Sequence, residues 1–153
     1  MSAPIQRIKP TLRLIKCTSF DSIIDVRSPS EFLDDHMPNA INLPVLDDAQ
    51  RESVGIIYNR RNPFEAKRTG AALVAQNISL YLQTELAKKD RNWRPLIYCW
   101  RGGHRSGAMA KIFSDIGWHA TVVEGGYKAY RKTVLDGLNH LPQQFKLIVL
   151  SGA

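Results

Sequence analysis

One cysteine of the chain lies in a setting that would make its sulfur a nucleophile. Cys99 is followed at once by a short polar loop that contains two glycines and two arginines. The loop comprises Trp100, Arg101, Gly102, Gly103, His104, Arg105 and Ser106. Glycines let backbone N–H groups approach an anion closely, and nearby arginines and a helix N-terminus lower the pKa of a thiol from its ordinary value near ~8.5. The thiolate is the reactive form of cysteine, so this pattern predicts nucleophilic chemistry at Cys99.

The alternative for Cys99 is a buried cysteine that only packs in the core. A cysteine taken alone favours that alternative, whereas the glycines and arginines that follow it at a predicted helix start favour chemistry. The second cysteine, Cys17, has no such loop and is interpreted as an ordinary thiol. Neither cysteine has another Cys or His at the spacing of a zinc site, so we expect no metal centre. A disulfide between the two is formally possible, but a reducing cytoplasm disfavours it.

Short apolar segments alternate with helical patterns along the chain, and they place Cys99 at the end of a strand. The predicted strands are residues 22–26, 40–43, 96–99 and 121–123, and the predicted helices begin at Pro29 or span 64–89, 106–116 and 127–138. Strands that alternate with helices form a parallel sheet with right-handed crossovers, which is an α/β fold. Such sheets bind their ligands at the carboxyl ends of the strands, where Cys99 is expected to lie.

Three separated motifs resemble those of rhodanese domains, and they occur in the same order. The opening motif comprises Ile24-Asp25-Val26-Arg27, Glu31-Phe32 and the run from His36 to Pro44. The loop from Cys99 to Ser106 is similar to the active-site loop of these domains, and the segment from Val123 to Tyr130 is similar to their closing motif. The resemblance runs from about residue 12 to 138. It implies a rhodanese-like α/β fold, with a central parallel sheet flanked by helices on both faces.

The same resemblance implies roles for individual residues. Cys99 would carry a persulfide, surrounded by the backbone amides of residues 100–105. Asp25, Arg27 and His36 are interpreted as structural support, because a charged side chain at a strand end usually pairs to fix a turn.

The length of the loop departs from the pattern of many single-domain sulfurtransferases. They place the loop arginine five positions after the cysteine, whereas Arg105 comes six positions after Cys99. The longer loop is also found in cysteine phosphatases, some of which share the rhodanese fold, so a phosphatase stays open as an alternative. A phosphatase needs a general acid for the leaving oxygen, and no aspartate lies in or just beside this loop.

The loop and the segment Glu124-Gly125-Gly126-Tyr127-Lys128-Ala129-Tyr130 together resemble one rhodanese branch in particular, the tRNA 2-selenouridine synthases. In that family the sulfur of 2-thiouridine at the tRNA wobble position is replaced by selenium from selenophosphate, through an S-geranylated intermediate made from geranyl diphosphate. The resemblance implies that Cys99 carries sulfur or selenium in the selenation half of this reaction. A general thiosulfate-type sulfurtransferase remains the main alternative, and a non-catalytic interaction module is disfavoured because such modules typically lack the cysteine.

The end of the chain suggests a second domain. In the tRNA 2-selenouridine synthases a P-loop domain follows the rhodanese domain directly. Residues 146–150 read as a new strand that runs into Ser151-Gly152-Ala153, which is how a phosphate-binding loop begins. We therefore expect a rhodanese domain over 1–140 and, over 141–153, a linker and the first strand of a truncated P-loop domain, with no cofactor in this fragment. A final strand of the same domain is the alternative.

The charge of the chain favours anionic partners, which fits tRNA. Lys and Arg number 21 against 14 Asp and Glu. Two candidate basic patches lie at the start and end of the predicted long helix: Arg60, Arg61, Lys67 and Arg68, and Lys88, Lys89, Arg91 and Arg94. Solvated helix ends are the alternative, since no aromatic residues are interleaved.

Two further expectations concern the membrane and a lipid-like substrate. No apolar run approaches the length of a membrane helix and the N-terminus makes a poor signal peptide, so we expect a cytoplasmic protein. Trp100 and Trp118 are candidates for an apolar pocket that holds a prenyl chain, although core packing is the expected role.

Overall fold

Five short strands form one parallel sheet, and Cys99 directly follows the middle strand. The computed structural model describes residues 4–12, 14, 19–60, 62–140, 146 and 148. The strands are β1 (Gln6–Ile8), β2 (Ser22–Asp25), β3 (Ala40–Asn42), β4 (Pro95–Tyr98) and β5 (Thr121–Val123). Their order in the sheet is β1-β5-β4-β2-β3, and every neighbouring pair is parallel. The carboxyl end of the central strand is where an open α/β sheet places its ligand site.

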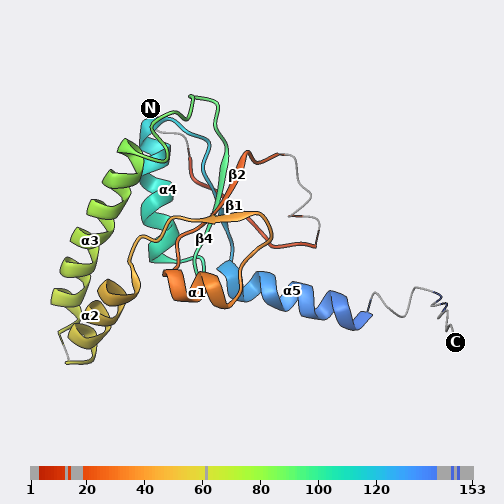
Figure 1. Cartoon of the computed structure of the whole chain (residues 1–153), viewed down its shortest axis with the longest axis horizontal. Coiled ribbons are helices and arrows are strands. Elements are labelled where there is room, and N and C mark those ends of the chain that lie inside the picture. Colours follow the sequence, from red (N-terminus) through yellow and green to blue (C-terminus); the bar gives the residue numbers. More distant parts are fainter. Residues whose placement is uncertain are drawn as a thin grey trace, which may run out of the picture.

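Helices cover both faces of this sheet, as predicted (Figure 1). They are α1 (Pro29–Asp34), α2 (Asp48–Asn59), α3 (Pro63–Gln83), α4 (His104–Ile116) and α5 (Gly126–His140). Side chains alternate along β4: Ile97 and the following Cys99 join a buried cluster with residues of α3 and α4, whereas Leu96 and Tyr98 join a second cluster with residues of α5. The sheet is therefore apolar on both sides, and Cys99 belongs to the side covered by α4.

Local signals explain where several elements begin and end. Ser28 caps α1 in a capping box with Glu31, and Pro29 occupies the first turn. Gly117 ends α4 in the left-handed conformation at φ 106°, a region that favours glycine. Ser28 followed by Pro29 and Glu31 predicts a helix start, and Gly117 after a helical pattern predicts a helix end, so the sequence indicates both features and the structure confirms them.

Three elements differ from the sequence prediction. Strand β1 and helix α2 have no predicted counterpart, although Asp47 and Gln50 form a capping box that marks the start of α2. Helix α2 has no buried residue, and its large apolar side chains are confined to its second half, at Val54, Ile56, Ile57 and Tyr58. Helix α3 ends at Gln83 rather than near residue 89, because the chain turns after Thr84 and buries Leu86 in the core.

Some predictions fall on residues that the structure does not describe. The predicted strand over 146–150 and the segment 151–153 lie mostly outside the described residues, so the expected second domain stays a prediction. Cys17 and Arg61 also lie outside them. Among the residues that the structure describes, no helix is long and apolar enough to cross a membrane.

Candidate active site

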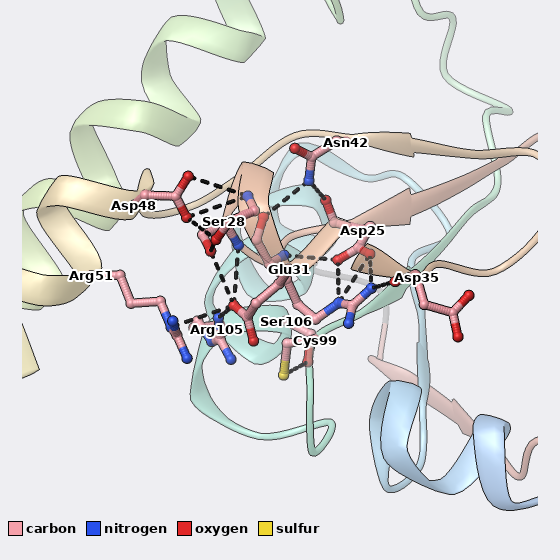
Figure 2. A network of polar contacts seen from close by, with 12 residues as sticks. Asp25, Ser28, Glu31, Asp35, Asn42, Asp48, Arg51, Cys99, Arg105 and Ser106 are labelled. Atoms are coloured by element: carbon pink, nitrogen blue, oxygen red, sulfur yellow. Dashed lines mark hydrogen bonds and ion pairs between the residues drawn. The ribbon is translucent and has the colours of Figure 1, made fainter. Parts of the chain in front are cut away.

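The sulfur of Cys99 sits under the first turn of α4. The residue is only 3% exposed, and its Sγ lies 3.2 Å from Oγ of Ser106 (Figure 2). Strand β4 is buried along its whole length and holds Cys99 at the carboxyl edge of the sheet. Gly103 is the N-cap of α4, so the N–H groups of the first turn of this helix have no partner within the helix. This first turn lies next to the sulfur of Cys99.

Hydrogen bonds favour the ionised form of this sulfur. Burial alone raises the pKa of Cys99, but the Ser106 hydroxyl and the nearby backbone N–H groups of Ser106, Arg101 and Gly103 stabilise the ionised sulfur and lower its pKa below the usual value. The net direction is downward. The site therefore favours the ionised sulfur more than an exposed thiol would be favoured, and the amide of Ser106 lies one residue beyond the predicted range of 100–105.

Contacts behind the loop aim two of these amides at the sulfur. In a trans peptide group the C=O and the N–H of the next residue point in opposite directions. The backbone N–H of Lys128 donates to the Trp100 carbonyl at 3.0 Å, which turns the Arg101 N–H of that peptide toward Cys99. Nη1 of Arg7 donates to the Gly102 carbonyl at 3.3 Å, which turns the Gly103 N–H the same way.

The glycines of the closing motif let the start of α5 touch this loop backbone to backbone. Gly102 and Gly126 both have a positive φ, 65° and 61°. A Cβ on Gly126 would lie 2.2 Å from the Cys99 carbonyl oxygen and 2.5 Å from the Gly102 nitrogen. A Cβ on Gly102 would lie 2.5 Å from the Val123 carbonyl oxygen. Only glycine fits at either position, and the close backbone contact between the start of α5 and the Cys99 loop supports that loop.

Arg105 has its charge offset by a carboxylate. Its Nη1 lies 2.9 Å from Oε2 of Glu31, and Nε of Arg51 lies 3.4 Å from the same oxygen (Figure 2). Burial raises the pKa of Glu31, but its hydrogen bond and ion pair with Arg105 lower it more. The formal positive charge that Arg105 was expected to add beside the sulfur is thus partly offset by this ion pair, which joins α4 to α1 and α2.

The remaining loop side chains differ in exposure. Arg101 and His104 are exposed, while Trp100 is half-buried and packs against Tyr127 with ring centroids 5.9 Å apart. Trp118 is a core residue, packed edge-on against Trp93 at 4.9 Å. The two predicted pocket tryptophans thus belong to opposite faces of the sheet, and core packing is the role that the structure shows for Trp118.

Asp25 and Arg27 form a buried ion pair at the end of β2. Nη2 of Arg27 lies 2.7 Å from Oδ2 of Asp25 and also donates to the Asp35 carbonyl at 2.6 Å. The guanidinium carbon lies 4.1 Å from the centre of the Tyr127 ring. The pair thereby ties β2 to the end of α1 and the start of α5, in contact with the elements that support the loop but not with the sulfur.

His36 lies apart from the sulfur as well. Its exposed ring stacks on Phe32, and Nδ1–H donates to the Phe32 carbonyl at 2.8 Å, just past the end of α1. Among the described residues there is no group of three His, Cys, Asp or Glu side chains that could hold a metal ion.

Several residues around the site were not found by sequence reasoning. Arg7 was not singled out, and Glu31 was seen only as part of the opening motif and a first-turn residue. Their partners lie 95 and 74 residues away along the chain, so no local pattern could have indicated these contacts. The structure also shows Glu31 in the capping box of α1, a local role that gives no sign of its ion pair with Arg105.

Comparison with protein families and curated proteins gives a consistent result. A family model described as "Rhodanese-like domain" matches residues 10–133. A tRNA 2-selenouridine synthase of Shewanella frigidimarina (strain NCIMB 400) is 34% identical over 131 residues, which cover 85% of this chain and 36% of that protein. The protein of the same name from Proteus mirabilis (strain HI4320) is 37% identical over 131 residues, with the same two coverages. The chain spans about a third of the length of these curated relatives.

Solved structures show the same fold. The N-terminal domain of a candidate ATP/GTP binding protein from Clostridium difficile 630 is 38% identical, with a TM-score of 0.68, over 85% of this chain and 99% of that one. A rhodanese-related protein from Thermoplasma volcanium is 18% identical, with a TM-score of 0.52, over 83% of this chain and 91% of that one. The second likeness concerns the fold alone.

Proposed function

Since the chain belongs to the rhodanese-like domain family, we propose that it is the rhodanese domain of a tRNA 2-selenouridine synthase, with Cys99 as the carrier of sulfur or selenium. The observation that carries this proposal is the buried sulfur of Cys99, which lies 3.2 Å from the Ser106 hydroxyl at the start of α4, where the backbone N–H groups of Arg101, Gly103 and Ser106 lower its pKa. A persulfide or perselenide is also an anion, so the same donors would stabilise the loaded carrier. Such a site suits both states of a transfer cycle.

The loading step follows from the ionised sulfur. The Cys99 thiolate attacks the terminal sulfur of a donor persulfide, a new S–S bond forms at Cys99, and the S–S bond of the donor breaks to release the donor thiolate. A donor with a terminal selenium would leave a perselenide on Cys99 in the same way. No oxidant or reductant is consumed, because the transferred atom keeps its oxidation state.

The wider reaction involves partners beyond these residues. We propose that the outer selenium of the loaded carrier attacks C2 of the S-geranylated wobble uridine of tRNA and displaces geranylthiol, and that thiols then reduce the Se–S bond to Cys99 and release the modified nucleotide. Selenophosphate and geranyl diphosphate are the family substrates. The proposal rests on the name of the curated relatives, of which this chain spans about a third. We accordingly propose that the protein acts in the cytoplasm, which fits the tRNA substrate in the name of the curated relatives.

Mass spectrometry after incubation with a small persulfide donor tests the proposal. The wild-type chain is expected to gain one sulfur atom on Cys99, and Cys99→Ala is expected to gain none there. Cys17→Ala is the matched control, since it removes a thiol that the proposal does not use. A wild-type chain that stays unmodified with several donors would contradict the proposal.

Two activity assays separate the alternatives. Efficient turnover of thiosulfate and cyanide by this domain alone would favour a general sulfurtransferase. Hydrolysis of an aryl phosphate with a burst that depends on Cys99 would favour a cysteine phosphatase.

A further inference from the structure

A basic hollow lies directly beside the Cys99 loop, between that loop and α5. It measures about 370 Å³ and is lined by Arg101, Gly125, Lys128, Ala129 and Lys132. Arg101 belongs to the loop, two residues after Cys99, and its backbone N–H is one of the donors to the sulfur. The hollow is thus built onto the reactive loop rather than at a distance from it.

The three cations of this hollow have no acidic partner among the described residues. Arg101, Lys128 and Lys132 are all exposed, and none of them takes part in the salt bridges found in the described part of the chain. Lys128 and Lys132 are four residues apart on α5, so their side chains lie on one face of the helix. Three unneutralised positive charges therefore gather around one small depression.

The patches predicted from the sequence are less suited to an anion. Arg68 pairs with Glu65 at 2.6 Å, and Arg94 pairs with Asp21 at 3.2 Å. The hollow that contains Lys88, Lys89 and Arg94 is also lined by Asp21 and Asp90. These surfaces carry mixed charge, whereas no carboxylate lines the hollow at α5.

We propose that the hollow formed by Arg101, Lys128 and Lys132 binds backbone phosphates of tRNA and thereby holds the nucleotide to be modified next to Cys99. This inference rests on the proposed function, because it names the surface that would receive the nucleic acid. Lysines contact phosphate as point charges and arginine as a planar donor, and the small side chains of Gly125 and Ala129 leave room for the phosphate between them.

Salt-dependent binding tests the proposal on the whole chain with an unmodified tRNA transcript. Each phosphate contact contributes roughly 0.7–0.9 to the slope of log affinity against log salt concentration. Removal of two contacts in Lys128→Ala/Lys132→Ala is therefore expected to reduce the loss of affinity between 50 and 200 mM salt by about 7- to 12-fold. Lys88→Ala/Lys89→Ala removes the same charge at the far end of α3 and is expected to keep the wild-type slope.

The salt dependence of the variants decides whether the hollow binds tRNA. Lys128→Arg/Lys132→Arg is expected to retain the wild-type slope, since the charges remain. A Lys128→Ala/Lys132→Ala variant with the wild-type slope, a control variant that loses as much, or a wild-type chain that does not bind tRNA overturns the proposal. Loading of wild-type Cys99 by the persulfide donor is a separate measurement, so failure of the hollow is distinguished from failure of the carrier function.

Discussion

Gly126 gives the sharpest test of how the loop is supported. In Gly126→Ala the new Cβ would lie 2.2 Å from the Cys99 carbonyl oxygen, 2.5 Å from the Gly102 nitrogen and 2.8 Å from the Trp100 carbonyl carbon. All three are backbone atoms, so no flexible side chain can move away. Residue 126 also has φ 61°, a conformation that alanine adopts at a cost.

The expected loss of stability follows from these two effects. The left-handed conformation costs a non-glycine residue about 1–2 kcal/mol, and overpacking of a rigid site costs about 1–3 kcal/mol. Gly126→Ala is therefore expected to lower the free energy of unfolding by about 2–5 kcal/mol. Because the clashing atoms belong to the Cys99 loop, the loop must shift, and the pKa of Cys99 is expected to rise as its amide donors move away.

Urea-induced unfolding measures the first effect, and the pH dependence of Cys99 alkylation measures the second. Gly107→Ala is the matched control, since Gly107 lies inside α4 and a Cβ there meets nothing within 4 Å. It is expected to stabilise the protein by about 0.5–1 kcal/mol, as alanine does in helices. If Gly126→Ala unfolds within about 0.5 kcal/mol of the wild type, a range usual for neutral surface changes, the argument from close backbone contact is wrong.

Three further predictions concern the sulfur of Cys99 and the buried ion pair between Asp25 and Arg27. Ser106→Ala removes a donor to the thiolate, so the pKa of Cys99 is expected to rise, and a pH profile of alkylation that does not move upward would contradict this. Because folding lowers the pKa of Cys99, the thiolate stabilises the folded chain above the ordinary thiol pKa, and this contribution is lost as the pH falls through the folded-state pKa. The free energy of unfolding of the wild type, measured by urea denaturation, should therefore rise with pH relative to Cys99→Ser as the pH approaches ~8.5, and parallel curves would refute the sign. Arg27→Met leaves the buried carboxylate of Asp25 unpaired and is expected to destabilise the fold by about 3–5 kcal/mol in the same assay, whereas a loss below about 1 kcal/mol would show that the pair is dispensable.

Local patterns predicted much of the fold because they act over a few residues. The buried strand before Cys99, the cap at Ser28 and the left-handed Gly117 each depend on neighbours within one turn. Helix α2 was not predicted; it buries none of its residues, and its large apolar side chains occur only in its second half. The short edge strand β1 has only three residues, too few to show a period.

The candidate site was predicted only in part, because several of its contacts join segments that lie far apart in the sequence. The glycines of the loop indicated that amides would surround Cys99, and the structure has the Arg101 and Gly103 amides there. The partners that orient those amides come from β1 and α5, far away in sequence. Contacts of this kind depend on how distant elements pack, which the spacing of residues along one segment does not encode.

The support of the loop from both ends of the chain has a consequence for how the reactive group arises. Arg7 comes from the first strand and Lys128 from the last helix, and each orients one peptide that faces the sulfur. A chain that has not yet docked both elements lacks the contacts that orient the Arg101 and Gly103 amides, so we expect its Cys99 thiol to be less acidic. The full acidity of Cys99 is thus expected only once β1 and α5 have packed beside the loop, when the sulfur is also buried.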